Sequence, residues 1–320
     1  MPARNRFNAP LTLIATIVAV LALAVTGCGD DDDKTASGGG SDLSGSITID
    51  GSSTVFPFAQ AAAEGFKEGS PNVKTTVGES GTGGGFEKFC AGETDISNAS
   101  RPIKDEEIEI CEKNGVKYRE LQVANDGIAV VTNPALAVDC LTTDELKKIW
   151  DKGSKVKSLS EVKDGAPDAE LSLFGPGTDS GTFDYFTDEI NGEEGRSRSD
   201  YQPSEDDNVL VEGVAGDDGG MGYFGFSYYE QNSDKLNLVG VDSGSGCVKP
   251  SSETIQDGSY KPLARPIFMY VSEEALAKEQ VKSFLTYSID EHTAVSELAE
   301  IVPMSEEQAT KAKETLDAAA

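Results

Sequence analysis

Glu79-Ser-Gly-Thr-Gly-Gly-Gly-Phe86, followed closely by Asp95-Ile-Ser-Asn-Ala-Ser-Arg-Pro-Ile103, is the most informative segment of this 320-residue chain. Glycines alternate here with hydroxyl side chains. A glycine-rich turn that leads into a helix points backbone N–H groups at whatever lies above the helix start, and the helix dipole favours an anion there. Gly51-Ser-Ser-Thr-Val-Phe-Pro57 and Thr178-Asp-Ser-Gly-Thr-Phe183 have the same composition. We therefore expect three loops that converge on one small oxyanion.

Residues 1–27 are predicted to be an export signal. Two arginines precede an apolar run from Leu11 to Val25, which is short for a membrane span. The small residues before Cys28 resemble a bacterial lipobox, which predicts that Cys28 carries a lipid such as palmitate and anchors the chain to the outer face of the cell membrane. A simple secretion signal with a chance cysteine is the alternative. Residues 28–44, rich in Asp, Gly and Ser, are predicted to be a flexible tether.

The net charge of −29 argues against nucleic acid as a partner, because phosphate backbones need cationic neutralisation. Any bound anion must be attracted by local groups against the overall field. A single histidine and the absence of a CxxC motif leave no expected metal or cofactor site.

Four cysteines follow Cys28, and an even number in an exported chain predicts two disulfides. Four cysteines permit three pairings. We favour Cys90–Cys111 and Cys140–Cys247, because the first pair flanks one compact unit.

Strands that alternate with helices predict βαβ units and a largely parallel sheet, with all three loops at the carboxyl ends of strands. Extended crossings near Asn125-Asp126 and Pro262–Pro266 divide the chain into two lobes. We expect lobe I to comprise residues 45–124 and 264–320, and lobe II residues 125–263.

Several local elements are also predicted. Tyr118–Val123 and Gly127–Asn133 have the composition of two separate strands, and Thr142 to Glu145 forms a capping box. Asn191 to Asp207, which is polar and rich in Gly, Arg and Ser, is expected to be a surface excursion.

Hydroxyl and backbone N–H groups are the expected ligands of the anion, because they supply many hydrogen bonds without net charge. The candidate side chains are Ser53, Thr54, Thr82, Ser180 and Thr182. A structural alternative is that they are helix N-caps.

Arg101 is the predicted cationic contact, since a guanidinium can donate two parallel bonds to an oxyanion. A surface ion pair is its alternative role. Asp126, at the first crossing, could accept a hydrogen bond from a protonated anion, or could be only a turn residue. Glu79 and Asp179 are weaker acceptor candidates.

No catalytic residue is predicted. Ser180 could be a nucleophile, but the one histidine, His292, lies in a polar segment, and a serine triad needs a base. Gly85 is followed by Phe86 where a Walker A motif has lysine.

The chain resembles the phosphate-specific ABC transporter substrate-binding proteins over about Ser46 to Ala318, through the three loops, the segment from Asp95 to Ile103 and Gly222-Tyr-Phe-Gly225. The resemblance implies a type II periplasmic-binding-protein fold, in which two βα lobes close by a hinge over one inorganic phosphate. Carried over by motif, it implies ligand contacts from a larger set of residues: Ser53, Thr54, Val55, Thr82, Ser100, Ser180, Gly181 and Thr182.

Two departures from the family pattern stand out. Gly175-Pro-Gly177 precedes the third loop where some members have an arginine, and Ser100 stands where the best-known pattern has an aspartate that accepts the ligand's proton. We infer that Arg101 replaces the first and Asp126 the second.

The predicted function is capture of inorganic phosphate by a monomeric, lipid-anchored receptor that delivers it to an ABC permease. The alternatives are a receptor for another tetrahedral oxyanion such as sulfate or arsenate, a surface phosphoester hydrolase with Ser180 as nucleophile, and an adhesion or structural lipoprotein.

Overall fold

The computed structural model describes residues 43–178 and 180–318. The predicted export signal, the predicted lipidation site Cys28, nearly all of the predicted tether and Asp179 lie outside these ranges. Within them, no helix is long and apolar enough to cross a membrane.

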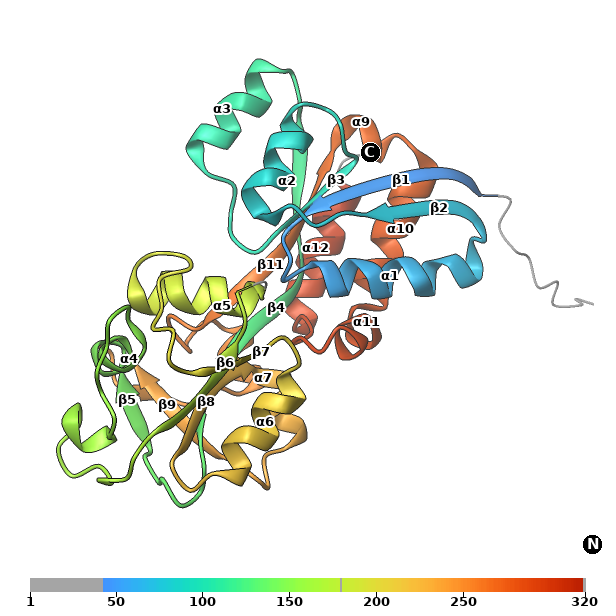
Figure 1. Ribbon diagram of the computed structural model, residues 1–320. Helices are drawn as coiled ribbons and strands as arrows, with labels where there is room; N and C mark the ends of the chain where they lie inside the picture. Colours follow the sequence, from blue (N-terminus) through green and yellow to red (C-terminus); the bar gives the residue numbers. More distant parts are fainter. Residues whose placement is uncertain (1–42, 179, 319–320) are drawn as a thin grey trace, which may run out of the picture. The chain divides into compact units, whose positions relative to one another are not determined.

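Strands and helices alternate along much of the chain, which ends in four successive helices (Figure 1). The strands are β1 Ser44–Gly51, β2 Asn72–Val77, β3 Ile96–Ala99, β4 Tyr118–Thr132, β5 Cys140–Thr142, β6 Ser172–Pro176, β7 Gln202–Ser204, β8 Gly220–Gly225, β9 Asn237–Asp242, β10 Cys247–Val248 and β11 Ala264–Ser272. The helices are α1 Phe56–Gly69, α2 Gly81–Cys90, α3 Asp105–Lys113, α4 Thr143–Trp150, η1 Leu159–Glu161, α5 Gly181–Phe186, η2 Thr187–Asn191, α6 Asp207–Gly216, α7 Phe226–Gln231, α8 Ser252–Gln256, α9 Glu273–Leu276, α10 Glu279–Asp290, α11 His292–Leu298 and α12 Glu306–Asp317.

The sheet is mixed rather than largely parallel, which corrects the sequence-based expectation. β1 pairs in parallel with β2 and β3, and β6 pairs in parallel with β7 and β8. Between these groups, β11 is antiparallel to β3 and β4, and β4 is antiparallel to β8. The strand order is β2-β1-β3-β11-β4-β8-β6-β7. β4 and β11 therefore link the two parallel groups (Figure 1).

β4 is one strand of 15 residues, so the prediction of two strands separated at Asn125 and Asp126 was wrong. Both polar residues continue the ladder, opposite Pro266 and Arg265 of β11. Their side chains are buried but have partners: the Asn125 amide donates to the Pro303 carbonyl oxygen, and the Asp126 carboxylate pairs with Arg265. Paired polar groups are tolerated inside a strand, because burial is costly only when the hydrogen bonds are lost.

The buried apolar side chains form two large clusters. One draws on residues between Ile128 and Leu263 together with Val302. The other draws on residues between Ile47 and Ala124 and between Ile267 and Leu316. Each of these two parts of the chain therefore has an apolar cluster of its own.

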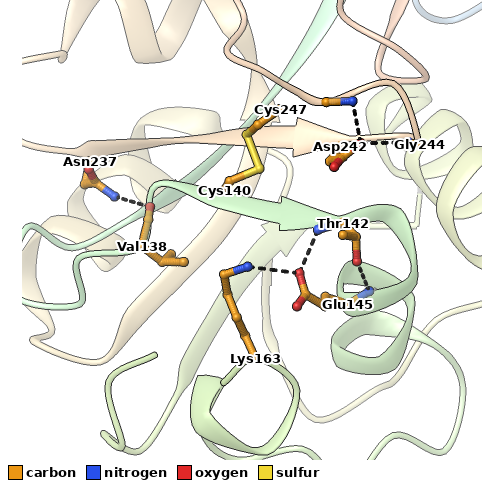
Figure 2. The surroundings of a disulfide bond; sticks show 10 residues. Val138, Cys140, Thr142, Glu145, Lys163, Asn237, Asp242, Gly244 and Cys247 are labelled. Atoms are coloured by element: carbon orange, nitrogen blue, oxygen red, sulfur yellow. Dashed lines mark hydrogen bonds and ion pairs between the residues drawn. A yellow bond between two sulfur atoms is a disulfide. The ribbon is translucent and has the colours of Figure 1, made fainter. Parts of the chain in front are cut away.

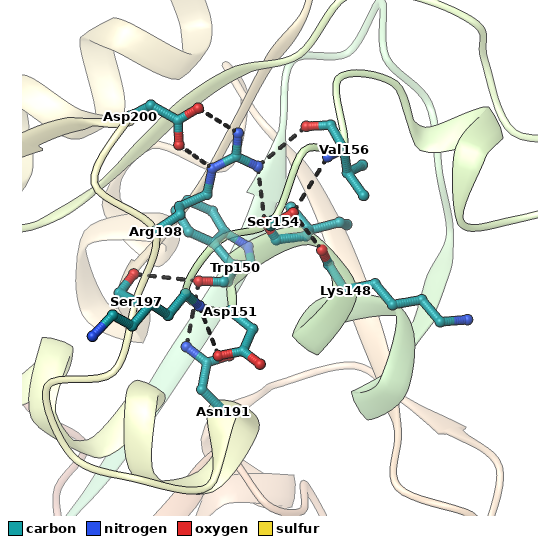
Figure 3. Close-up of polar contacts among 11 residues, drawn as sticks. Lys148, Trp150, Asp151, Ser154, Val156, Asn191, Ser197, Arg198 and Asp200 are labelled. Carbon is teal, nitrogen blue, oxygen red and sulfur yellow. Dashed lines mark hydrogen bonds and ion pairs between the residues drawn. The ribbon is translucent and has the colours of Figure 1, made fainter.

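The segment from Asn191 to Asp207 is anchored to the protein and is not only a surface excursion. Arg198 is 7% exposed, and its Nη1 donates to the carbonyl oxygens of Ile149 and Val156 while Nε and Nη2 bind Asp200 (Figure 3). Because the guanidinium has hydrogen-bond partners at all three nitrogens, its burial is tolerated. The polar composition of the segment alone does not predict this anchoring.

Both predicted disulfides are confirmed, with Cys90 bonded to Cys111 and Cys140 to Cys247. The second joins β5 to β10 (Figure 2). Beside it, the predicted capping box is confirmed: Thr142 Oγ1 accepts from the Glu145 N–H, and the Glu145 carboxylate accepts from the Thr142 N–H.

Candidate functional site

All three predicted loops contribute to one cavity of about 880 Å³. Of the predicted ligand residues, those that line it are Ser53, Thr54, Thr82, Ser100, Arg101 and Gly181. The other predicted residues, which do not line it, are Val55, Asp126, Ser180 and Thr182. The loops come from distant parts of the sequence, so their convergence is a product of the fold.

The first loop, Gly51–Pro57, leads into α1 without using its hydroxyls as a cap. The N-cap of α1 is Val55, and no side chain accepts a hydrogen bond there. Ser53 and Thr54 are therefore not explained as helix caps. They lie at the amino end of a 14-residue helix, where the dipole favours negative charge.

The second loop, Gly81–Gly85, is itself the first turn of α2, whereas the sequence indicated a loop before the helix. The glycines allow close packing: a Cβ on Gly85 would lie 2.5 Å from the Gly51 Cα. Thr82 Oγ1 lies 3.1 Å from Ser100 Oγ and accepts from the Ser100 N–H at 3.3 Å. This contact joins the start of α2 to the segment after β3.

The third loop, Thr178–Phe183, reaches the first at Gly181. A Cβ on Gly181 would lie 2.5 Å from Thr54 Oγ1 and 2.8 Å from Ser53 Oγ, so the contact requires glycine. Ser180 caps α5, because its Oγ accepts from the Thr182 N–H. For Ser180, the capping role that we considered as the alternative is present in the structure.

Arg101 lines the cavity but is already paired. Its Nη1 and Nη2 donate to the two carboxylate oxygens of Glu107 at 2.9 and 2.8 Å. Burial raises the pKa of the Glu107 carboxyl, but the bonds from Arg101 and the Lys104 N–H outweigh burial and hold the pKa below its usual value. The surface ion pair considered as the alternative role of Arg101 is therefore present.

Arg265 is a cationic residue that sequence reasoning missed. Its side chain is 14% exposed, lines the cavity and bridges two loops, since Nη2 donates to Thr54 Oγ1 at 2.9 Å and to the Gly181 carbonyl oxygen at 3.5 Å. The guanidinium carbon lies 3.7 Å from the centroid of the Tyr185 ring. Arg265 falls within the predicted second crossing, between Pro262 and Pro266. Its position at a predicted crossing between the two lobes is the feature of the sequence from which a role in the cavity could have been predicted.

Asp126 is paired with that arginine. Arg265 Nε donates to Asp126 Oδ2 at 3.1 Å, and the carboxylate is 8% exposed. An ion pair behind the cavity orients the guanidinium and leaves Arg265 Nη1 without a hydrogen bond to any residue in the described ranges.

One wall of the cavity is acidic and comes from α5 and the segment after it. The carboxylates that line it are those of Asp184, Asp188, Glu189 and Glu194. Burial, together with Glu194, raises the pKa of Asp184 to about 6, although Arg265 acts in the opposite direction. No cluster of at least three His, Cys, Asp or Glu residues in the described ranges could hold a metal ion.

A two-cluster α/β fold, with helix amino ends and hydroxyl groups around a cavity, indicates that the protein belongs to the class of substrate-binding proteins. A family model described as a PBP superfamily domain matches residues 36–292. The relatives and a solved structure narrow the class: the chain belongs to the phosphate-binding proteins of ABC transporters.

Three similarities support this assignment. The chain is 48% identical to the protein SphX of Synechococcus elongatus over 261 residues, covering 81% of this chain and 77% of the relative. It is 38% identical to the phosphate-binding protein PstS of Staphylococcus haemolyticus over 283 residues, covering 87% and 88%. The crystal structure of a possible phosphate-binding protein from Planctomyces limnophilus matches with a TM-score of 0.81 and 43% identity, covering 87% of this chain and 99% of that one.

The family membership confirms the predicted two-lobe periplasmic-binding-protein fold and the prediction of a transport receptor rather than an enzyme. The ligand assignments of the individual residues stay predictions.

Proposed function

We propose that the chain captures inorganic phosphate in the 880 Å³ cavity and delivers it to an ABC permease for import. The observation that carries this proposal is Arg265, a largely buried cation that touches the first and third loops at once and has Nη1 unpaired within the described ranges. In a chain with a net charge of −29, such a local cation is what an anion site requires.

The proposed ligand contacts come from both sides of the cavity. Ser53 and Thr54 with the amino end of α1, and Thr82 with Ser100, would donate from one side, and Gly181 at the amino end of α5 from the other. Arg265 would supply charge-assisted bonds between them, which are stronger than neutral ones. The predicted contacts of Val55, Ser180 and Thr182 would be made through backbone N–H groups or after a small closure of the cavity.

We further propose that residues 45–124 with 264–320, and residues 125–263, move as two lobes on β4 and β11. The division of the apolar side chains into two clusters supports these bounds, with Val302 as the exception that packs into the cluster of residues 125–263. A ligand that contacts both lobes shifts the population towards the closed state by its difference in affinity for the two states.

The proposal includes the lipid anchor at Cys28 and a monomeric receptor. Sulfate and arsenate are the competing ligands, because each is a tetrahedral oxyanion that hydroxyl and N–H donors can bind.

Isothermal titration calorimetry of the purified, oxidised protein tests the proposal. We expect tight binding of phosphate that Arg265→Ala weakens, while Arg196→Ala, which removes an exposed ion pair with Asp151, leaves it intact. Competition with sulfate and arsenate then ranks the ligands. If addition of phosphate to the ligand-free protein releases no heat, the proposal is excluded. If the protein binds sulfate more tightly than phosphate, sulfate and not phosphate is its ligand.

A further inference from the structure

Tyr185, on α5, lines the cavity and lies against the guanidinium of Arg265. The guanidinium carbon is 3.7 Å from the centroid of the ring, so the two groups are in direct contact. The residue is 8% exposed, and its hydroxyl donates to the Pro262 carbonyl oxygen. Tyr185 therefore contacts both ends of the segment from Pro262 to Arg265, which belongs to the predicted second crossing between the lobes.

The hydrogen bonds of Arg265 come from the edge of its guanidinium. A guanidinium donates only in its own plane, and its two faces carry no donor or acceptor. Nε donates to Asp126, and Nη2 donates to Thr54 and Gly181. Nη1 is left without a hydrogen bond to any residue that the structure describes. Because the Tyr185 ring covers one of the faces, it holds the group without using any N–H donor.

An aromatic ring is suited to hold a cation beside an anion site. The face of the ring carries partial negative charge and attracts the guanidinium, most strongly where water is excluded. A carboxylate in the same place would bind the N–H groups and neutralise the cation, as Glu107 does for Arg101. Burial raises the pKa of the Tyr185 hydroxyl, so the side chain stays uncharged at neutral pH. The ring therefore fixes the cation without competing with the ligand.

Two carboxylates on the acidic wall are competing partners for Arg265. Burial raises the pKa of Asp184 and of Glu189, and Arg265 opposes the rise in both, so both carboxylates lie within reach of its charge. Among the described residues, however, Arg265 forms its ion pair with Asp126. Without the ring, the guanidinium could turn towards Asp184 or Glu189, and Nη1 would no longer be free for a ligand.

We propose that Tyr185 is a positioning residue of the phosphate site, whose ring fixes the plane of the Arg265 guanidinium and keeps Nη1 available to the anion. This inference rests on the proposed function and adds to it a residue that lies outside the three loops. Since Tyr185 acts through Arg265, its contribution to phosphate affinity depends on the arginine. The hydroxyl has a separate, structural role, because it fastens α5 to Pro262.

Calorimetric titration with phosphate tests the role of the ring. We expect Tyr185→Leu, which removes the aromatic face, to reduce phosphate affinity by roughly 3- to 30-fold, the range for a buried cation–π contact. Tyr185→Phe keeps the ring and is expected to keep the affinity, although it unfolds at a lower temperature because the Pro262 carbonyl oxygen loses its donor. Tyr229→Leu, which removes a tyrosine ring packed against Phe226 away from the cavity, is the control and should bind phosphate normally.

A double-mutant cycle separates a positioning residue from a merely structural one. The Tyr185→Leu change is made in the unmodified protein and in Arg265→Lys, whose ammonium group has no flat face to stack on the ring. We expect the change to reduce phosphate affinity much less in the Arg265→Lys background. A residue that only supports the fold of α5 would reduce the affinity equally in both backgrounds.

Three results overturn the inference: unchanged phosphate affinity in a folded Tyr185→Leu variant, equal losses in the two backgrounds, or a loss in Tyr185→Phe as large as that in Arg265→Lys. Should Tyr185→Leu fail to fold, Tyr185→Met takes its place, because a methionine fills the space without an aromatic face. Absence of phosphate binding by the unmodified protein is a different result, because it removes the proposed function itself.

Discussion

Arg265 on β11 lies directly opposite Asp126 on β4, and its Nε donates to the Asp126 carboxylate at 3.1 Å. The pair sits where the two strands pass between the two core clusters. While Nε binds Asp126 on β4, Nη2 donates to Thr54 in the first loop and to Gly181 in the third. A single side chain thus connects the strand pair, the first loop and the third loop, so movement of any of them changes the position of the cation.

Arg265→Ala is expected to weaken phosphate binding by about 1.5–3 kcal/mol, because it removes charge-assisted hydrogen bonds and leaves Asp126 buried and unpaired. Arg101→Ala is expected to cost less, since Glu107 already occupies both of its terminal nitrogens. Arg265→Lys should recover part of the affinity but not the bridge between the two loops. Calorimetry with phosphate on the three variants measures the order, and a larger loss for Arg101→Ala would contradict it.

Gly181→Ala is expected to reduce phosphate affinity by separating the first and third loops. The added Cβ would lie 2.5 Å from Thr54 Oγ1 and 3.1 Å from the Thr54 backbone nitrogen, and the backbone atom cannot move aside as a side chain would. Gly216→Ala is the matched control, because a Cβ there meets no atom within 4 Å. Calorimetry and thermal unfolding on both variants separate loss of binding from loss of stability. Equal phosphate affinities for both would show that the approach of the two loops is not needed.

Sequence patterns predicted the local elements and the three loops well, because both depend on neighbouring residues. The capping box at Thr142 and the helix after Gly181 follow from side chains a few positions apart. The helical first turn of α2 could not be predicted in this way, because glycines are poor helix formers and favour loops. The reason for glycine in this turn is a tertiary contact, the close approach of Gly85 to Gly51.

The cation of the site could not be chosen from sequence, because the contacts that place Arg265 in the cavity come from residues far along the chain. Arg101 had the better local motif, but Glu107 neutralises it. Arg265 had no motif, but the fold brings it within reach of Thr54, which is 211 positions away. The same applies to Asp126, whose partner is 139 positions away.

Loss of the Cys140–Cys247 disulfide is expected to destabilise the protein more than loss of Cys90–Cys111. The sequence separations are 107 and 21 residues, and the chain-entropy model gives a difference of about 1.5 kcal/mol for loops of these lengths. Urea unfolding of the two double Cys→Ala variants measures the difference. A greater loss from the shorter loop would indicate that native packing around Cys90, and not chain entropy, dominates.

Asp207 is expected to make the protein less stable at neutral pH than it would be with a neutral side chain. Burial raises its pKa to about 6, partly offset by the Gly225 N–H, and the nearby carboxylates of Glu300, Asp206 and Asp126 raise it further. Between the ordinary aspartate pKa and 6, the folded protein therefore holds a proton that the unfolded chain has released. Stability attributable to this group falls as the pH rises through that window and is constant above it.

Asp207→Asn removes this dependence while its side-chain oxygen can still accept from the Gly225 N–H. We expect the variant to unfold at a higher temperature than the unmodified protein at pH 7.5 and to lose that advantage by pH 4.5. Asp218→Asn, at an exposed position eleven residues further along, is the control for the change in net charge and should show no such difference between the two pH values. An advantage of Asp207→Asn that is as large at pH 4.5 as at pH 7.5 would mean that the buried charge is not its cause.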